Sequence, residues 1–156
     1  FIHGGSAIIE GLGEKIRLTD ELPELHAVLV FPPTACATGK VYEKFDELTM
    51  NEAISLQEER VYAQTAPDAL LDVFNDLTQP AFMLHPELHQ TALKLTQIAE
   101  VPAHLTGSGS TFFLLCSDPL HAEHLSTALS NQLDLPCRAV SSSPGVEMHG
   151  PSEENA

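Results

Sequence analysis

The segment LTGSGSTFF, from Leu105 to Phe113, carries the most information about the fold. Its two glycines, separated by one serine, let the backbone turn sharply and approach a ligand closely, because glycine tolerates positive φ. Short apolar runs typical of strands lie on either side, at Ala103–Leu105 and Thr111–Cys116. The segment therefore predicts two neighbouring strands joined by a tight loop of small residues, Thr106–Thr111, called the Gly-Ser loop below.

Further strands are expected on both sides of this pair. His26–Phe31 is a continuous apolar run short enough for a buried strand, and Cys137–Val140 reads as a last short strand. Ser6–Glu10 and Glu14–Leu18 are separated by a turn with two glycines, which predicts a β-hairpin ahead of the other strands.

Helices are expected between the strands. Thr38 is a suitable N-cap, with Val41 and Phe45 following at helical spacing. The clearest helical pattern covers Leu84–Ala99, and an Asp-Pro pair opens the last helix, Asp118–Leu133. The order strand, helices, strand, strand, helix, strand predicts an α+β fold. We expect a two-layer, ferredoxin-like split βαβ sandwich with additional helices, preceded by the hairpin.

The composition excludes several classes of partner. The net charge is −15, with 7 Lys+Arg against 22 Asp+Glu, so neither nucleic acid nor an anionic membrane surface is expected as a partner. No apolar run approaches the roughly 18 residues of a membrane span. Cys36, Cys116 and Cys137 form no disulfide framework, which favours a reducing, cytoplasmic setting.

The Gly-Ser loop is the candidate binding element. Successive N–H groups in such a turn can bind an anion, and Ser108, Ser110 and Thr111 add hydroxyl donors. The alternative is a hairpin connection that needs glycine only for its turn type. The loop is neither a Walker loop nor a dinucleotide fingerprint, because a strand is expected where those motifs require a helix.

Leu105–Phe113 resembles the third conserved motif of the GHMP kinase superfamily. Three other segments are similar to parts of one family within this superfamily, the diphosphocytidyl-methylerythritol kinases. These segments are Phe1–Glu14, Val30–Tyr42 and Asn75–Leu88. The resemblance covers the chain from Phe1 to about Pro144. It implies transfer of the γ-phosphoryl group of ATP, with Mg²⁺, to a hydroxyl group of a cytidine diphosphate substrate.

The resemblance also implies a domain organisation. Residues 1–25 would be the hairpin and loop at the end of an N-terminal ATP-binding domain that this chain lacks. Residues 26–144 would be the GHMP kinase C-terminal domain, and residues 145–156 a disordered tail. The family's phosphate-binding loop and its catalytic Asp and Lys precede Phe1, so no catalytic residue is assigned to this chain, and alone it is expected to be inactive.

The resemblance implies two groups of site residues in this chain. The loop lining the active site would be Thr106, Gly107, Ser108, Gly109, Ser110 and Thr111. Phe113 matches an aromatic position able to stack on cytosine. Phe112 precedes it where many relatives have a smaller residue, so either ring could face the base, and core packing is the alternative for both.

Other polar residues are weaker candidates. His85 with His89, and His121 with His124, could each share a helix face, but no further ligand completes a metal site, so none is predicted. Asp76 is read as a helix cap. Two other functions stay open: another GHMP kinase, of homoserine or mevalonate type, and a non-enzymatic small-ligand binding module.

Overall fold

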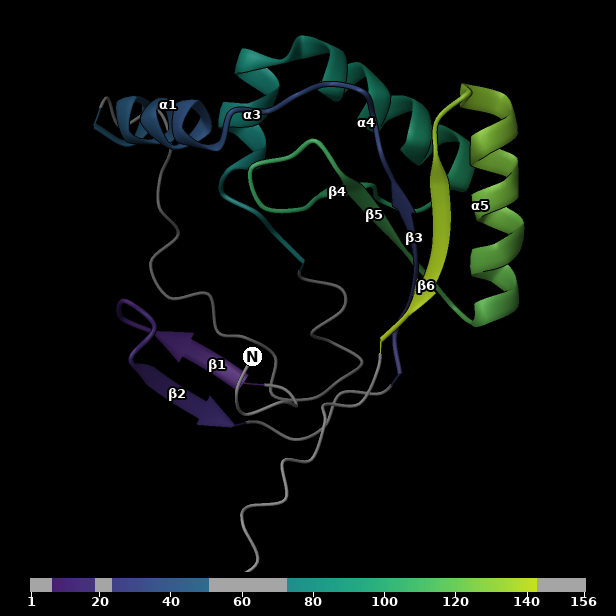
Figure 1. Ribbon diagram of the computed structural model, residues 1–156, viewed down its shortest axis with the longest axis horizontal. Helices are drawn as coiled ribbons and strands as arrows, with labels where there is room; N and C mark the ends of the chain where they lie inside the picture. Colours follow the sequence, from purple (N-terminus) through teal and green to yellow (C-terminus); the bar gives the residue numbers. More distant parts are fainter. Residues whose placement is uncertain (1–6, 19–23, 51–72, 143–156) are drawn as a thin grey trace, which may run out of the picture. The chain divides into compact units, whose positions relative to one another are not determined.

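The computed structural model describes residues 7–18, 24–50 and 73–142 (Figure 1). The chain divides into two compact units, residues 1–24 with 142–156 and residues 25–141. The predicted tail, 145–156, lies outside the described residues. Within the described part, no helix is long and apolar enough to cross a membrane. The candidate site lies entirely in the second unit.

The first unit contains the predicted hairpin. Strand β1 (Ala7–Glu10) pairs antiparallel with β2 (Lys15–Leu18). Ile9 and Ile16 lie opposite each other in this register and are 64% and 47% exposed. Since a two-stranded hairpin is at best marginally stable alone, this apolar pair is a natural contact surface for another element.

The second unit is built on a sheet in which four strands are described, in the order β4-β5-β3-β6. They are β3 (His26–Val30), β4 (His104–Leu105), β5 (Phe112–Cys116) and β6 (Cys137–Ser141). All pairings are antiparallel, and β3 lies between β5 and β6. This is the order of a split βαβ sheet. The predicted α+β fold is confirmed.

The described helices are α1 (Thr38–Met50), α3 (Thr78–Leu84), α4 (Pro86–Ala99) and α5 (Pro119–Leu133). The helix predicted over 84–99 is therefore interrupted: Leu84 ends α3, and α4 begins at Pro86. His85 between them has φ −132° and ψ 76°, because a residue before proline is disfavoured in the helical region. Helix α3 was not predicted.

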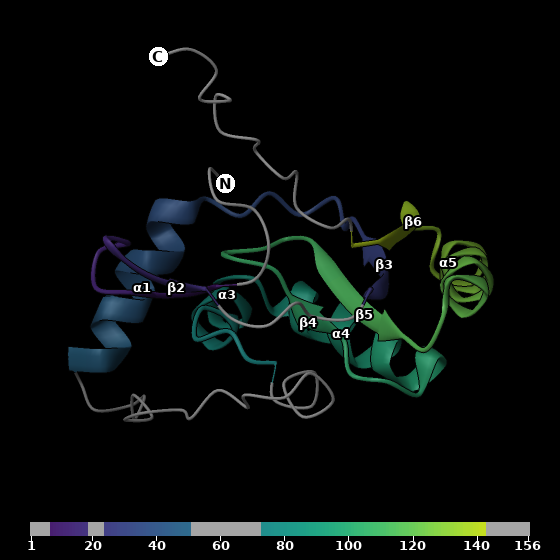
Figure 2. The same ribbon diagram turned by 90° about the horizontal axis from the view of Figure 1, so that it is seen from below.

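The core lies between one face of the sheet and the helices α4 and α5 (Figures 1 and 2). Successive residues of a strand point to opposite faces. Accordingly Val28, Val30, Phe112 and Leu114 are fully buried against the helices. The same alternation turns Phe113 towards the other face of the sheet.

The helix starts differ in how they are capped. The Asp118 carboxylate accepts a 2.8 Å bond from the backbone N–H of His121, as predicted for an N-cap. That bond, with one from the Ser117 hydroxyl, holds the pKa of Asp118 below its usual value. In α1 the first helical bonds reach the carbonyl oxygen of Ala37. The cap thus falls one residue before the predicted Thr38, whose hydroxyl is used elsewhere.

Candidate functional site

The Gly-Ser loop joins β4 to β5 and has a defined conformation. The N–H of Thr106 donates to the carbonyl oxygen of Thr111, and the N–H of Gly109 donates to that of Thr106, both at 2.9 Å. Gly107 and Gly109 have φ of 51° and 90°, a region that favours glycine. The two glycines are therefore required by the backbone of the turn itself.

Three separate segments hold this loop. The Ser110 hydroxyl donates to the carbonyl oxygen of Pro32, just after β3, at 3.3 Å. The hydroxyl oxygens of Thr38, at the start of α1, and Ser108 lie 2.9 Å apart within hydrogen-bonding distance. Asn75, ahead of α3, is the third anchor. The loop is thus connected to the starts of two helices and to the end of the central strand.

Neither Asn75 nor Asp76 is the N-cap of α3: that residue is Leu77, which makes no side-chain cap hydrogen bond. The N–H of Leu77 donates to Asn75 Oδ1 at 3.0 Å, and the N–H of Thr78 donates to the Asn75 carbonyl oxygen at 3.0 Å. Asp76 is exposed and its cap assignment is wrong, because α3 begins at Thr78 with Leu77 as its N-cap. The sequence alone does not reveal the role of Asn75, because asparagine is common in turns next to helices.

An open hollow of about 480 Å³ lies beside the loop. Its lining is Val73, Phe74, Asn75, Thr78, Ala103, His104, Leu105, Thr106, Gly107 and Phe113. Of the loop residues predicted to line a site, Thr106 and Gly107 are in this set, whereas Ser108, Gly109, Ser110 and Thr111 are not. Among the described residues the lining contains no lysine or arginine, so an anion bound by them would rely on N–H and hydroxyl donors.

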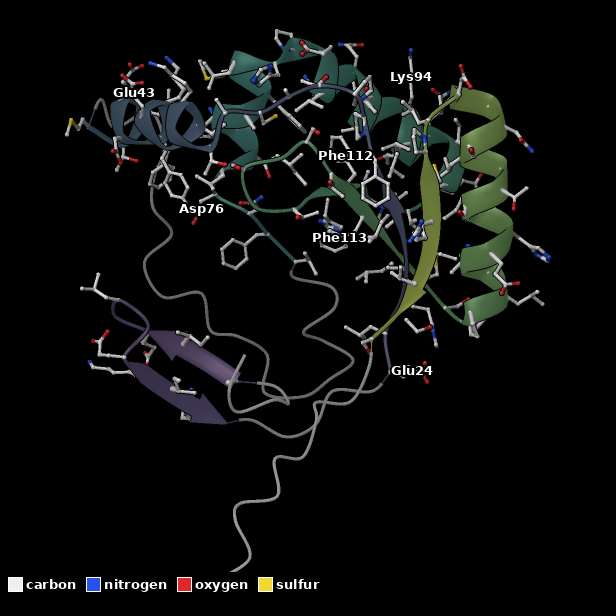
Figure 3. All side chains as sticks on the ribbon, viewed as in Figure 1. Glu24, Glu43, Asp76, Lys94, Phe112 and Phe113 are labelled. Atoms are coloured by element: carbon white, nitrogen blue, oxygen red, sulfur yellow. The ribbon has the colours of Figure 1, made fainter. Side chains whose placement is uncertain are left out.

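The two phenylalanines lie on opposite sides of β5 (Figure 3). The Phe113 ring lines the hollow and stacks on His104, with ring centroids 5.2 Å apart and planes inclined by 26°. The Phe112 ring is fully buried, and its centroid lies 6.3 Å from that of Phe82. The structure therefore leaves Phe113 as the ring of this pair that a ligand in the hollow could contact.

His104, which stacks on Phe113, is partly buried. Burial lowers the pKa of His104 from its ordinary value of 6.5. The imidazole is therefore neutral at physiological pH, where it offers one donor and one acceptor nitrogen to the hollow.

We expect the stability of the chain to fall on acidification, in part because of His104. The unfolded state binds its proton near pH 6.5, and the native state only at lower pH, so stability is lost as pH drops through 6.5 towards the lowered pKa. Urea unfolding midpoints between about pH 8 and about pH 5 measure this. His104→Gln should flatten the profile, whereas exposed His124→Gln should not; equal slopes for both variants would contradict the assignment.

The cysteines and the other histidines considered in the sequence analysis lie in surroundings that fit packing and local hydrogen bonding. Burial is the main cause that raises the pKa of the thiols of Cys36, Cys116 and Cys137, which disfavours the thiolate form. His89 stacks on Phe82 with ring centroids 5.1 Å apart, and His121 Nδ1 lies 3.1 Å from the Ser117 hydroxyl. In the part of the chain that the structure describes, no group of three or more His, Cys, Asp or Glu side chains could hold a metal ion.

No protein-family model matches the chain. It is 32% identical over 133 residues to the 4-diphosphocytidyl-2-C-methyl-D-erythritol kinase of Caulobacter vibrioides, covering 82% of this chain and 46% of the relative. The crystal structure of a 4-(cytidine 5′-diphospho)-2C-methyl-D-erythritol kinase superposes with a TM-score of 0.67 at 28% identity, over 86% of this chain and 48% of the other. The L. major mevalonate kinase structure superposes with a TM-score of 0.60 at 13% identity, over 88% and 48%, which shows the shared fold alone.

The resemblance that the sequence motifs indicated is thereby confirmed. The chain spans about half the length of the curated relatives it matches. It is homologous to the 4-diphosphocytidyl-2-C-methyl-D-erythritol kinases of the GHMP superfamily and corresponds to about half of such a protein.

Proposed function

We propose that this chain is the C-terminal part of a cytoplasmic, ATP-dependent kinase that phosphorylates 4-diphosphocytidyl-2-C-methyl-D-erythritol in non-mevalonate isoprenoid synthesis. The observation that carries the proposal is the match over 82% of the chain to relatives with this name. The solved structure of similar name supports it independently, since it matches in fold and at 28% identity.

In this proposal the hollow receives the cytidine end of the substrate. The Phe113 ring, already stacked on His104, offers an aromatic face to the base, while Phe112 is buried in the core on the opposite face of β5. Thr106–Thr111 lines the active site and supports the phosphate-binding elements with N–H and hydroxyl groups. The absence of lysine and arginine from the described lining fits a role in orientation more than in charge neutralisation.

The phosphoryl-transfer machinery belongs, in this proposal, to a part of the protein outside this chain. The Gly-Ser loop carries no lysine, and among the described residues no group of three or more His, Cys, Asp or Glu side chains could hold a metal ion. The resemblance assigns the catalytic Asp and Lys and the main phosphate loop to an N-terminal domain. This chain would hold and orient the acceptor, which is a large part of the catalytic task in phosphoryl transfer.

The hairpin suggests how the two parts connect. Ile9 and Ile16 form an exposed apolar pair on a two-stranded hairpin, an element that is at best marginally stable alone. We assign residues 1–25 to the end of the N-terminal domain and residues 26–144 to the C-terminal domain. The partner that the exposed pair requires is therefore the protein's own N-terminal domain.

The function is tested by turnover of the longer protein with this 156-residue chain as control. We expect ADP release with ATP, Mg²⁺ and 4-diphosphocytidyl-2-C-methyl-D-erythritol, and none above background with homoserine or mevalonate. The chain alone should show no turnover, because the groups that bind and activate ATP are assigned elsewhere.

Each other outcome corrects a specific part of the proposal. Turnover only with homoserine or mevalonate would keep the superfamily and replace the substrate. Turnover by the isolated chain would contradict the assignment of the ATP-binding and catalytic groups to a part of the protein outside this chain. No turnover by a folded longer protein would favour the non-enzymatic binding module.

A further inference from the structure

The side-chain amide of Asn75 makes two hydrogen bonds to the Gly-Ser loop and its flank. Asn75 Nδ2 donates to the carbonyl oxygen of Leu105 at 2.9 Å and to that of Gly107 at 2.7 Å. These acceptors lie 30 and 32 residues further along the chain, on either side of Thr106. Asn75 therefore fixes two nearby peptide groups of the loop from outside.

The chemistry of the partners decides which way the Asn75 amide points. Both groups near Nδ2 are carbonyl oxygens, which only accept, and the group near Oδ1 is the N–H of Leu77, which only donates. A flipped amide would place its oxygen against the two carbonyl oxygens and its NH₂ group against the N–H of Leu77. Asparagine is required here, because an aspartate would place a carboxylate oxygen against two carbonyl oxygens.

These bonds determine which groups of the loop are free to meet a ligand. The carbonyl oxygen of Thr106 accepts from Gly109, so the carbonyls of Leu105, Thr106 and Gly107 all have partners within the protein. Carbonyl and N–H point in opposite directions in a trans peptide. Because the Gly107 carbonyl is held by Asn75, the N–H of Ser108 faces away from Asn75.

We propose that Asn75 is a positioning residue that keeps the carbonyl oxygens of Leu105 and Gly107 turned inward, so that the N–H of Ser108 is left to face a phosphate-bearing ligand. Without it, the carbonyls of Leu105 and Gly107 could rotate towards that ligand and repel its negative charge. The part concerning the ligand rests on the proposed function. The part concerning loop conformation rests only on the contacts of Asn75.

The conformational part is tested on this chain by residue-resolved amide hydrogen exchange. In Asn75→Asp and Asn75→Ala, the amides of Thr106 and Gly109 should exchange about tenfold faster, because the loop loses two external hydrogen bonds. Amides of α5 should be unchanged. The matched control is Asp76→Asn, which alters the exposed neighbour. Unchanged loop exchange, or equal acceleration in α5, would overturn the proposal.

The ligand part is tested by steady-state kinetics of the longer protein. Asn75→Asp should lower kcat about tenfold or more while the KM for ATP changes little, and Asp76→Asn should stay within about twofold of the parent. Faster loop exchange with unaltered turnover would overturn the ligand part. If the unmutated longer protein shows no turnover, the proposed kinase function fails, but the exchange experiment still decides whether Asn75 holds the loop.

Discussion

Replacing Phe112 by alanine is expected to lower the free energy of unfolding by about 3–5 kcal/mol, the usual cost of deleting a buried aromatic ring. The ring is fully buried on the helix-facing side of β5, within the cluster that joins the sheet to α4 and α5. Removing the ring leaves a cavity between the sheet and the helices, because the other core residues hold these two layers in place. Urea unfolding of this chain measures the loss.

Phe113→Ala provides the matched comparison, one residue away on the other face. Its ring is only partly buried, so the stability cost should be clearly smaller. By contrast, it should weaken binding of a cytidine nucleotide to the longer protein by about tenfold, as stacking on a base is worth roughly 1–3 kcal/mol. Leu115→Ala, on the same face of β5 but outside the hollow, controls for a general change in the strand.

The reverse pattern would be informative. If Phe112→Ala weakened nucleotide binding without a large loss of stability, the assignment of the two faces of β5 would be wrong. If neither variant affected binding, the hollow would not be the site of the base, and the aromatic platform would have to be sought elsewhere.

The two phenylalanines also show what could be predicted from the sequence. Strand alternation established that only one ring could face a ligand, and the structure confirms the strand. The choice between them depends on which face the helices cover. That is set by the pairing of β5 with β3, in which Phe112 lies opposite Val30 and Phe113 opposite Leu29. This register joins residues about 80 positions apart, and no local pattern encodes it.

The helical region shows a different limit. The apolar spacing over 84–99 predicted one helix correctly except at its start, because Leu84 fits the stripe but belongs to α3. Pro86 suits the first turn of a helix, and its effect on the preceding residue is what separates the two helices. Asn75 is a further case: an asparagine at a helix junction looks like a local cap, and its bonds to Leu105 and Gly107 exist only in the folded chain.

Gly109→Ala is expected to destabilise the chain by roughly 1–3 kcal/mol and to abolish most turnover of the longer protein. Gly109 has φ of 90°, which side-chain-bearing residues rarely adopt. A Cβ there would lie 3.2 Å from Cys36 Sγ and 3.3 Å from Leu105 Cδ1, closer than ordinary contact. Urea unfolding and ADP release measure the two effects.

Gly107 is the control, because it lies in the same loop without these neighbours. Its φ of 51° suits asparagine better than most residues, and a Cβ there meets nothing within 4 Å among the described atoms. Gly107→Asn should therefore cost less stability than Gly109→Ala. Adding Cys36→Ala to Gly109→Ala removes the Sγ contact but not the backbone strain, so it should restore part of the stability. Full restoration would mean that crowding by Cys36, and not the positive φ, is what requires glycine at 109; no restoration would leave the positive φ and the contact with Leu105 as the causes.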